Sequence, residues 1–492
     1  MNLGIVRRLM IGALVLVAPG GLSAQEEQGL RAAYRLESVE YRLEGRTRQW
    51  VLEDLLELEP GMTFPDEVSL ETHLANEQQR LINQRALQEG LVTAELETDS
   101  AQPIPVHVTV TTRDTWNIIA LPYAKYDSNS GLLLSLRGRD YNFFGTLSTL
   151  EANLDYEFTE DEENLVTLSS NFSLPFNMLE RRWRLIMDQS LEIGADDVDF
   201  QFGLGLGHTF QGLGLDWEAV YSQSYRYLTN DEYSDNSYGT SRLELSTSIA
   251  TPVVLPGFGQ VTYGPSLYTE TSYRPGGMSE ERRGLRTGFD HGLGAGGSDW
   301  IGNYRRGLRL RIDNDNSYNI NENAWDSDIT ARVSGYLPLW QPTEEVWPKA
   351  GVSASLSTFY LVTGADEDQD DAATDARGLL NDTMQGDLGV FANLDAVITV
   401  WTLEPIFEAQ FGVFFDTALV RDLRGEFSDS TGFDTQRDLR FGSGIEVIGF
   451  PLFARSLYVR GSLGFDLREI ADGTHPLDGN AREIFIGLGH HY

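Results

Sequence analysis

The chain contains no cysteine among its 492 residues. That absence excludes disulfides, thiolate catalysis, cysteine-ligated zinc and a lipobox. Lysine is almost absent too, since Lys125 and Lys349 are the only two, and the formal net charge is −37. Nucleic-acid phosphates need basic partners, so we expect no nucleic-acid partner.

Long apolar runs are also lacking. Beyond the first 24 residues, no uninterrupted apolar stretch is long enough for a transmembrane helix, which needs about 20 residues. Barrel strands need only about 9–11 alternating residues, so a membrane protein of that kind stays open. The 49 glycines and the 11% aromatic content are more typical of β than of helical proteins.

Residues 1–24 have the pattern of a secretory signal peptide. Arg7 and Arg8 form its positive region, Leu9–Pro19 its apolar core, and Leu22-Ser23-Ala24 an imperfect cleavage site. We expect cleavage after Ala24. The alternative is an uncleaved anchor helix, for which the apolar core is short.

Residues 34–113 predict a small α+β domain. Thr47 is expected to cap a helix ending at Leu56, and Asp66 a second helix running to about Gln88. Strands are predicted over Leu36–Leu43, Leu91–Glu97 and Ile104–Thr112. The turn Leu58–Phe64 lies between the two helices.

Residues 115–492 alternate between apolar and polar side chains in strand-length segments, starting with Asn117–Tyr126. In one segment Leu150, Ala152, Leu154 and Tyr156 alternate with Glu151, Asn153, Asp155 and Glu157. A soluble sandwich alternates as well, but this pattern continues without a second core layer. It favours a transmembrane antiparallel β-barrel with lipid outside and a polar lumen. A simple count of the segments gives 18 strands.

The connections between these segments alternate between short turns and long polar loops. Long loops are predicted near Leu228–Thr240, Asp313–Trp325, Gly364–Gly386 and Arg421–Asp438. Short turns on one rim and long loops on the other are typical of outer-membrane barrels. Because the α+β domain precedes the first strand, we expect the short-turn rim to face the periplasm.

One stretch carries the candidate site. Ala376-Arg377-Gly378-Leu379 lies on the longest acidic loop, Asn393-Leu394-Asp395 follows, and Phe414–Ala418 includes Asp416. A guanidinium offers carboxylates a planar fork, so we predict that Arg377 pairs with Asp416 and also with Asp395. The alternative is that Arg377 is a solvated loop residue.

The last residues read as a terminal barrel strand over 484–492. Ile484, Ile486 and Leu488 alternate, and the chain ends on the aromatic Tyr492. Such an ending resembles the terminal insertion signal of bacterial outer-membrane proteins. The adjacent His490 and His491 point to opposite faces of a strand, so no metal site is predicted there.

Together these motifs resemble the outer-membrane protein assembly-factor superfamily, the BamA/TamA-like bacterial surface antigen type. The order of elements in 34–113 and its Leu-x-Pro-Gly-x-x-Phe turn resemble a single POTRA domain. In that family a loop with a V/I-R-G-F/Y motif folds into a barrel of about 16 strands, and its Arg pairs with acidic wall residues. Here Ala376 and Leu379 replace the branched and aromatic positions, and Ala418 replaces a glycine.

The resemblance implies a protein of the bacterial outer membrane, with its POTRA-like domain in the periplasm. Its function would be to receive client polypeptides and insert them at the barrel seam. Expected partners are unfolded outer-membrane proteins or secreted polypeptides, the lipid bilayer, and periplasmic or lipoprotein subunits. No enzyme activity, cofactor or metal is expected.

Three alternatives remain at this stage. One is a polypeptide secretion channel or plugged pore of the same superfamily, although residues 25–33 are short for the plug helix of two-partner channels. Another is a passive binding protein or surface antigen. The last is a barrel enzyme, for which no Ser-His-Asp or paired-carboxylate set stands out.

Overall fold

A computed structural model describes residues 33–97, 102–127, 131–158, 164–194, 197–229, 236–275, 277–279, 284–321, 323–340, 349–363, 375–379, 384–423, 433–454, 456–476 and 481–488. The predicted signal segment 1–24 lies outside these ranges, as do His490, His491 and Tyr492. Within them, no helix has the length and apolar character needed to cross a membrane.

The N-terminal module is a four-stranded sheet covered by helices. Its elements are β1 (Tyr34–Glu44), α2 (Gln49–Leu55), β2 (Thr63–Phe64), α3 (Glu67–Asn83), β3 (Leu87–Leu96) and β4 (Ile104–Asp114). The sheet order is β2-β1-β4-β3, and β1 and β4 are parallel. The short strand β2 forms within the segment that the sequence predicted as a turn.

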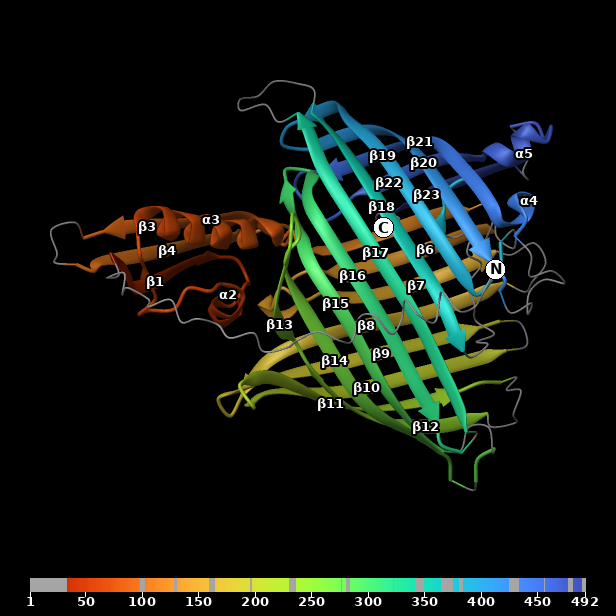
Figure 1. Cartoon of the computed structure of the whole chain (residues 1–492), viewed down its shortest axis with the longest axis horizontal. Helices are drawn as coiled ribbons and strands as arrows, with labels where there is room; N and C mark the ends of the chain where they lie inside the picture. The colour runs from red at the N-terminus through yellow and green to blue at the C-terminus, as the bar shows by residue number, and fades with distance from the viewer. Residues whose placement is uncertain are drawn as a thin grey trace, which may run out of the picture.

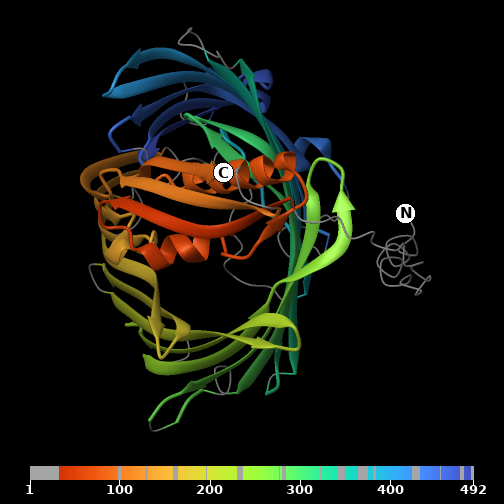
Figure 2. The ribbon, with the colours of Figure 1, turned by 90° about the vertical axis from the view of Figure 1, so that its left-hand side faces the viewer.

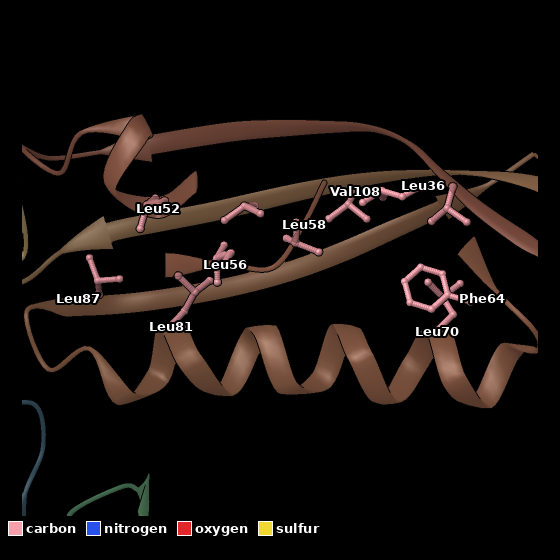
Figure 3. Packing of buried hydrophobic residues seen from close by; sticks show 11 residues of the cluster. Leu36, Leu52, Leu56, Leu58, Phe64, Leu70, Leu81, Leu87 and Val108 are labelled. Atoms are coloured by element: carbon pink, nitrogen blue, oxygen red, sulfur yellow. The ribbon is translucent and has the colours of Figure 1, made fainter. Parts of the chain in front are cut away.

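Apolar side chains fill the space between α3 and the sheet (Figure 3). Leu70 and Leu81 of α3 are 2% and 0% exposed, and they share a buried cluster with Leu36 and Val108. Leucines at helical spacing facing alternate residues of a strand bury one face of each element. This cluster is the hydrophobic core of the module.

The helix termini follow the prediction at one end of α3 and differ elsewhere. Asp66 caps α3 by accepting a hydrogen bond from Ser69 N at 2.7 Å. Thr47 does not cap α2, because its hydroxyl donates to Asp114 at 2.6 Å instead. The predicted continuation of α3 to Gln88 is also wrong: the helix ends at Asn83, since Leu87 already pairs with β4.

The rest of the described chain forms an antiparallel ring of strands, so the expected β-barrel architecture is confirmed (Figure 1). The strands are β5 (Ile118–Asp127), β6 (Gly131–Asp140), β7 (Leu150–Phe158), β8 (Leu165–Met178), β9 (Arg181–Ile193), β10 (Val198–Gly212), β11 (Leu215–Tyr227), β12 (Ser237–Thr247), β13 (Ile249–Leu255), β14 (Gly259–Tyr273), β15 (Leu285–Ile301), β16 (Tyr304–Asn319), β17 (Ala324–Trp340), β18 (Ala350–Thr363), β19 (Leu388–Leu403), β20 (Phe407–Arg421), β21 (Leu439–Pro451), β22 (Val459–Asp466) and β23 (Arg482–Leu488). A 3₁₀ turn, η1 (Phe143–Gly145), and the short helices α4 (Thr435–Asp438) and α5 (Leu467–Ala471) lie in connections.

The number of strands differs from the 16 that the family resemblance implied. Nineteen strands, β5 to β23, form the ring in the described residues, but β12 and β13 pair with successive parts of the same neighbour, β14. They therefore share one position, which leaves eighteen. An antiparallel ring closes only with an even number of positions, and eighteen equals the count made from the alternation of side chains.

The two faces of the barrel wall differ in polarity, as β20 illustrates. Glu408, Gln410 and Asp416 point inward and are at most 3% exposed, whereas Val413 and Phe415 point outward and are 47% and 40% exposed. An apolar outer face and a polar inner face are what a lipid-embedded barrel requires.

The long loop predicted over Asp313–Trp325 is largely strand. β16 continues to Asn319 and β17 begins at Ala324, and Asp313 to Asn319 pair with residues of β17. The polar residues of this stretch belong to the wall of the barrel, where side chains of one face contact polar partners. Asn314 Nδ2, for example, donates to the Asp328 carbonyl at 2.7 Å.

The N-terminal module lies across one open end of the barrel (Figure 2). On one side Arg46 contacts Asp140 at 2.8 Å, and Asn142, which is fully buried, donates to Thr47 at 2.8 Å. On another side the Arg85 guanidinium lies 4.4 Å from the centroid of the Trp300 ring. These contacts lie at the β6–β7 and β15–β16 ends of the barrel wall, which are far apart around the ring.

Candidate functional site

The site is built around the described tip of a loop, residues 375–379, between β18 and β19. Ala376 and Leu379 are 2% and 1% exposed, and they pack in a buried cluster with Phe391 and Ala418 from the barrel wall. Both residues that depart from the motif of the resembled family are therefore buried at the wall. This packing holds the tip of the loop against β19 and β20.

Arg377 is the centre of the polar part of the site. Its Nε and Nη2 donate to the two carboxylate oxygens of Asp416, each at 2.8 Å, and its backbone N–H donates to Asp416 Oδ2 at 2.9 Å. The side chains of Arg377 and Asp416 are 2% and 0% exposed. A bidentate pair of this kind fixes orientation as well as distance, which a lysine ammonium does not do.

Two further carboxylates complete the surroundings of the guanidinium. Arg377 Nη1 lies 2.6 Å from Asp395 Oδ1 and 3.5 Å from Glu446 Oε2. Glu446 in turn accepts a hydrogen bond from Arg460 Nε at 2.8 Å. Arg377 and Arg460 thus offset the charge of three buried carboxylates, contributed by β19, β20 and β21.

The flat face of the guanidinium is also covered. Its central carbon lies 4.0 Å from the centroid of the Phe414 ring, which is 3% exposed. Cation–π contacts of desolvated guanidinium groups add stabilisation on the order of 2 kcal/mol. The aromatic ring therefore covers one face of the guanidinium, and its edges contact carboxylates.

Glycines allow the backbone of the loop to come this close to the wall. Gly378 has φ +85°, and a Cβ there would lie 2.8 Å from the backbone nitrogen of Phe465. A Cβ at Gly442 would lie 1.8 Å from the Arg377 carbonyl oxygen. Any side chain at these two positions would push the loop off the wall.

The structure brings together all four residues predicted for the loop-to-barrel pairing: Arg377, Gly378, Asp395 and Asp416. Of the predicted terminal signal, Ile484, Ile486 and Leu488 lie on β23, and Ile486 is 51% exposed on the outer face. Tyr492 lies outside the described residues.

Three charged residues of the site were missed: Glu446, Arg460 and Glu483. Each lies within an alternating strand and belongs to no motif. The signal that was present is a charge on the inner face of a strand that is otherwise small or apolar, such as Glu446 between Gly444 and Ile448. Within the described part of the chain, no three His, Asp or Glu side chains are grouped so as to hold a metal ion.

The seam of the barrel lies next to this site. The first barrel strand, β5, has ten registered pairs with β6, and the last, β23, has seven with β22. Between β23 and β5 the described residues show one registered pair, Phe485 with Asp127. In the part of the chain that the structure describes, the ring is thus completed by a much weaker ladder than any that flanks it.

Comparison with solved structures supports the fold. CdiB from Escherichia coli superposes with a TM-score of 0.50 at 13% identity, covering 93% of this chain and 77% of that one. CdiB from Acinetobacter baumannii gives 0.49 at 12% identity (93% and 74% covered), and BamA from Haemophilus ducreyi lacking POTRA domains 1–3 gives 0.38 at 12% identity (92% and 84%). No family model matches the sequence, and no curated protein matches it.

Proposed function

We propose that this protein is an outer-membrane barrel that inserts client polypeptides at the seam between β23 and β5. The observation that carries the proposal is the seam itself, with one registered pair in the described residues against seven and ten in the adjoining ladders. Unpaired strand edges are templates for another strand. A client strand would pair there and move its apolar side chains directly into lipid.

The N-terminal module supports the same function. Its strand β3 pairs with β4 alone, so the other edge of β3 has no strand beside it in the described sheet. An extended peptide adds to such an edge through main-chain hydrogen bonds. Because the module lies across the end of the barrel, a client bound at β3 would be held beside the barrel opening (Figure 2).

This function requires neither a cofactor nor a catalytic step. The free energy for insertion would come from strand pairing and from burial of apolar surface in lipid. We therefore propose a protein without enzyme activity, placed in the bacterial outer membrane with the module on the periplasmic side.

The test is depletion of the protein in its host, followed by a census of outer-membrane proteins. A broad fall in other barrel proteins is the expected result. Loss of a single secreted product, with the other barrels unchanged, would refute insertion and support a dedicated secretion channel.

A plugged pore is the second candidate, and the buried loop tip favours it. Residues 375–379 lie against the inner wall, with Arg377 held by three carboxylates, as a plug would be. Planar-bilayer conductance separates the two functions. A steep rise in conductance on deletion of 364–386 supports the pore, and an unchanged low conductance argues against it.

A further inference from the structure

The last strand of the barrel is attached to the lumenal loop through Glu483. This carboxylate, on β23, accepts a hydrogen bond from the backbone N–H of Gly378 at the loop tip. Glu483 is 7% exposed, so the contact is shielded from water. We propose that Glu483 is the positioning residue that holds β23 at the seam, so that the lumenal loop controls whether the seam is closed. This inference rests on the proposed role of the seam.

The hydrogen bond from Gly378 to Glu483 depends on a backbone conformation that only glycine adopts readily. Gly378 is in the left-handed region, with φ +85°, and packs directly on β22. A Cβ at Gly464 of β22 would lie 2.6 Å from the Gly378 Cα, so both positions are restricted to glycine. The N–H of residue 378 is thereby directed at β23 rather than at a neighbouring loop residue.

The other side of the loop tip is fixed independently. Arg377, the preceding residue, is bound to Asp416 on β20 and lies against Asp395 on β19. Two adjacent loop residues therefore connect β23 with strands three and four positions away around the ring. This connection does not depend on the ladder between β23 and β22.

The hydrogen bond between Gly378 and Glu483 matters because the described residues of β23 and β5 form so few pairs at the seam. A hydrogen bond to a carboxylate is about twice as strong as one between neutral groups. One such bond, shielded from water, is therefore comparable with the single registered pair between β23 and β5. On the outer face of β23, Ile486 is half exposed and points away from the lumen.

Release of Gly378 from Glu483 would accordingly free β23 from the inside of the barrel. β23 would keep its pairs with β22, while its register with β5 would be lost first. The geometry thus makes the loop a restraint on the seam as well as an occupant of the lumen. A client that displaced the loop tip would open the place where it inserts.

The absence of native cysteine makes a direct test possible. Asp127→Cys with Phe485→Cys places a cysteine pair at the registered seam position, where opposed Cβ atoms are within disulfide reach. Leu463→Cys with Ile484→Cys is the matched control across β22 and β23. Oxidative cross-linking of the purified full chain in detergent micelles is measured for both pairs, with Glu483, Glu483→Ala and Glu483→Gln.

We expect Glu483→Ala to lower the rate of seam cross-linking several-fold and to leave the control pair unchanged. Glu483→Gln keeps an acceptor but not the charge, so its rate should fall between the two. Unaffected control cross-linking and heat-modifiable migration show that each variant is folded. If Glu483→Ala does not fold, Glu483→Gln alone decides the matter.

Seam cross-linking equal to wild type in every folded variant would overturn the proposal. So would an equal fall in the control pair, which would indicate general loosening of the barrel. No client is present in this experiment, so its outcome is separate from the depletion test. A seam restrained by Glu483 is compatible with either result of that census, and a failed restraint leaves insertion itself intact.

Discussion

Replacement of Arg377 by alanine is the sharpest test of the buried charge cluster. The variant leaves Asp416, Asp395 and Glu446 without their shared cation, and their side chains are 0%, 9% and 4% exposed. Removing one partner of a buried ion pair costs about 3–5 kcal/mol, since the remaining charge stays in a low-dielectric site. At about 1.4 kcal/mol per factor of ten, even the lower value changes the ratio of folded to unfolded protein more than a hundredfold.

The assay is urea unfolding of the refolded barrel, followed by heat-modifiable electrophoretic migration. Arg311→Ala is the matched control, because Arg311 is 63% exposed and pairs with Asp313, where about 0–1 kcal/mol is expected. Arg377→Lys keeps the charge and loses the fork, so it should be intermediate. If Arg377→Ala unfolds at the same urea concentration as Arg311→Ala, the cluster does not hold the loop in the way that the distances indicate.

A second experiment completes this reasoning. In Arg377→Ala/Asp416→Ala, the loss of stability should be smaller than the sum of the two single losses, because one unpaired charge has been removed with the other. Strict additivity would mean that the two side chains act independently, despite their 2.8 Å contacts.

Further predictions concern the N-terminal module and its junction with the barrel. Leu81→Ala, at a position with 0% exposure, should destabilise the module by about 2–5 kcal/mol, measured by thermal unfolding. Asn142→Ala, which removes a fully buried side chain from the junction, should cost about 1–3 kcal/mol and raise protease sensitivity between module and barrel. Hydrogen bonds from Ser69 hold the pKa of the Asp66 carboxyl below its usual value, so its stabilising effect is present above about pH 3.9 and is lost as the pH falls through the lower folded pKa. The melting temperature of Asp66→Ala should therefore lie below that of wild type at neutral pH, and the difference should shrink in acid; a constant difference would refute the role of the carboxylate charge.

The barrel follows from the sequence because side-chain alternation is a local property. Residues such as Leu150–Tyr156 place one face in lipid and the other in the lumen, and each strand carries this information by itself. The count of 18 strands was obtained in the same way, and it agrees with the structure better than the number implied by family resemblance. The cap at Asp66 was equally predictable, because capping involves only neighbouring residues.

Tertiary structure decided where some strands and helices end, because residues outside the element compete for its hydrogen-bonding groups. Thr47 is a good N-cap in isolation, yet Asp114 takes its hydroxyl. The polar stretch after Asp313 has the composition of a loop, yet pairing with β17 keeps it in the wall. In the first case the partner is far away in sequence, and in the second it is the next strand along the chain.

The sequence by itself predicted a barrel with a polar lumen, because each strand alternates between apolar and polar side chains. It also predicted that a loop arginine pairs with carboxylates of the wall, because Arg377 lies in a short motif. Only the folded ring placed Glu446, Arg460 and Glu483 beside that loop. They come from three different strands, β21, β22 and β23, and nothing local marks them as partners. The single registered pair that the described residues show between β23 and β5 is likewise a property of ring closure. It depends on the twist accumulated over all eighteen strand positions, not on the sequence of any one strand.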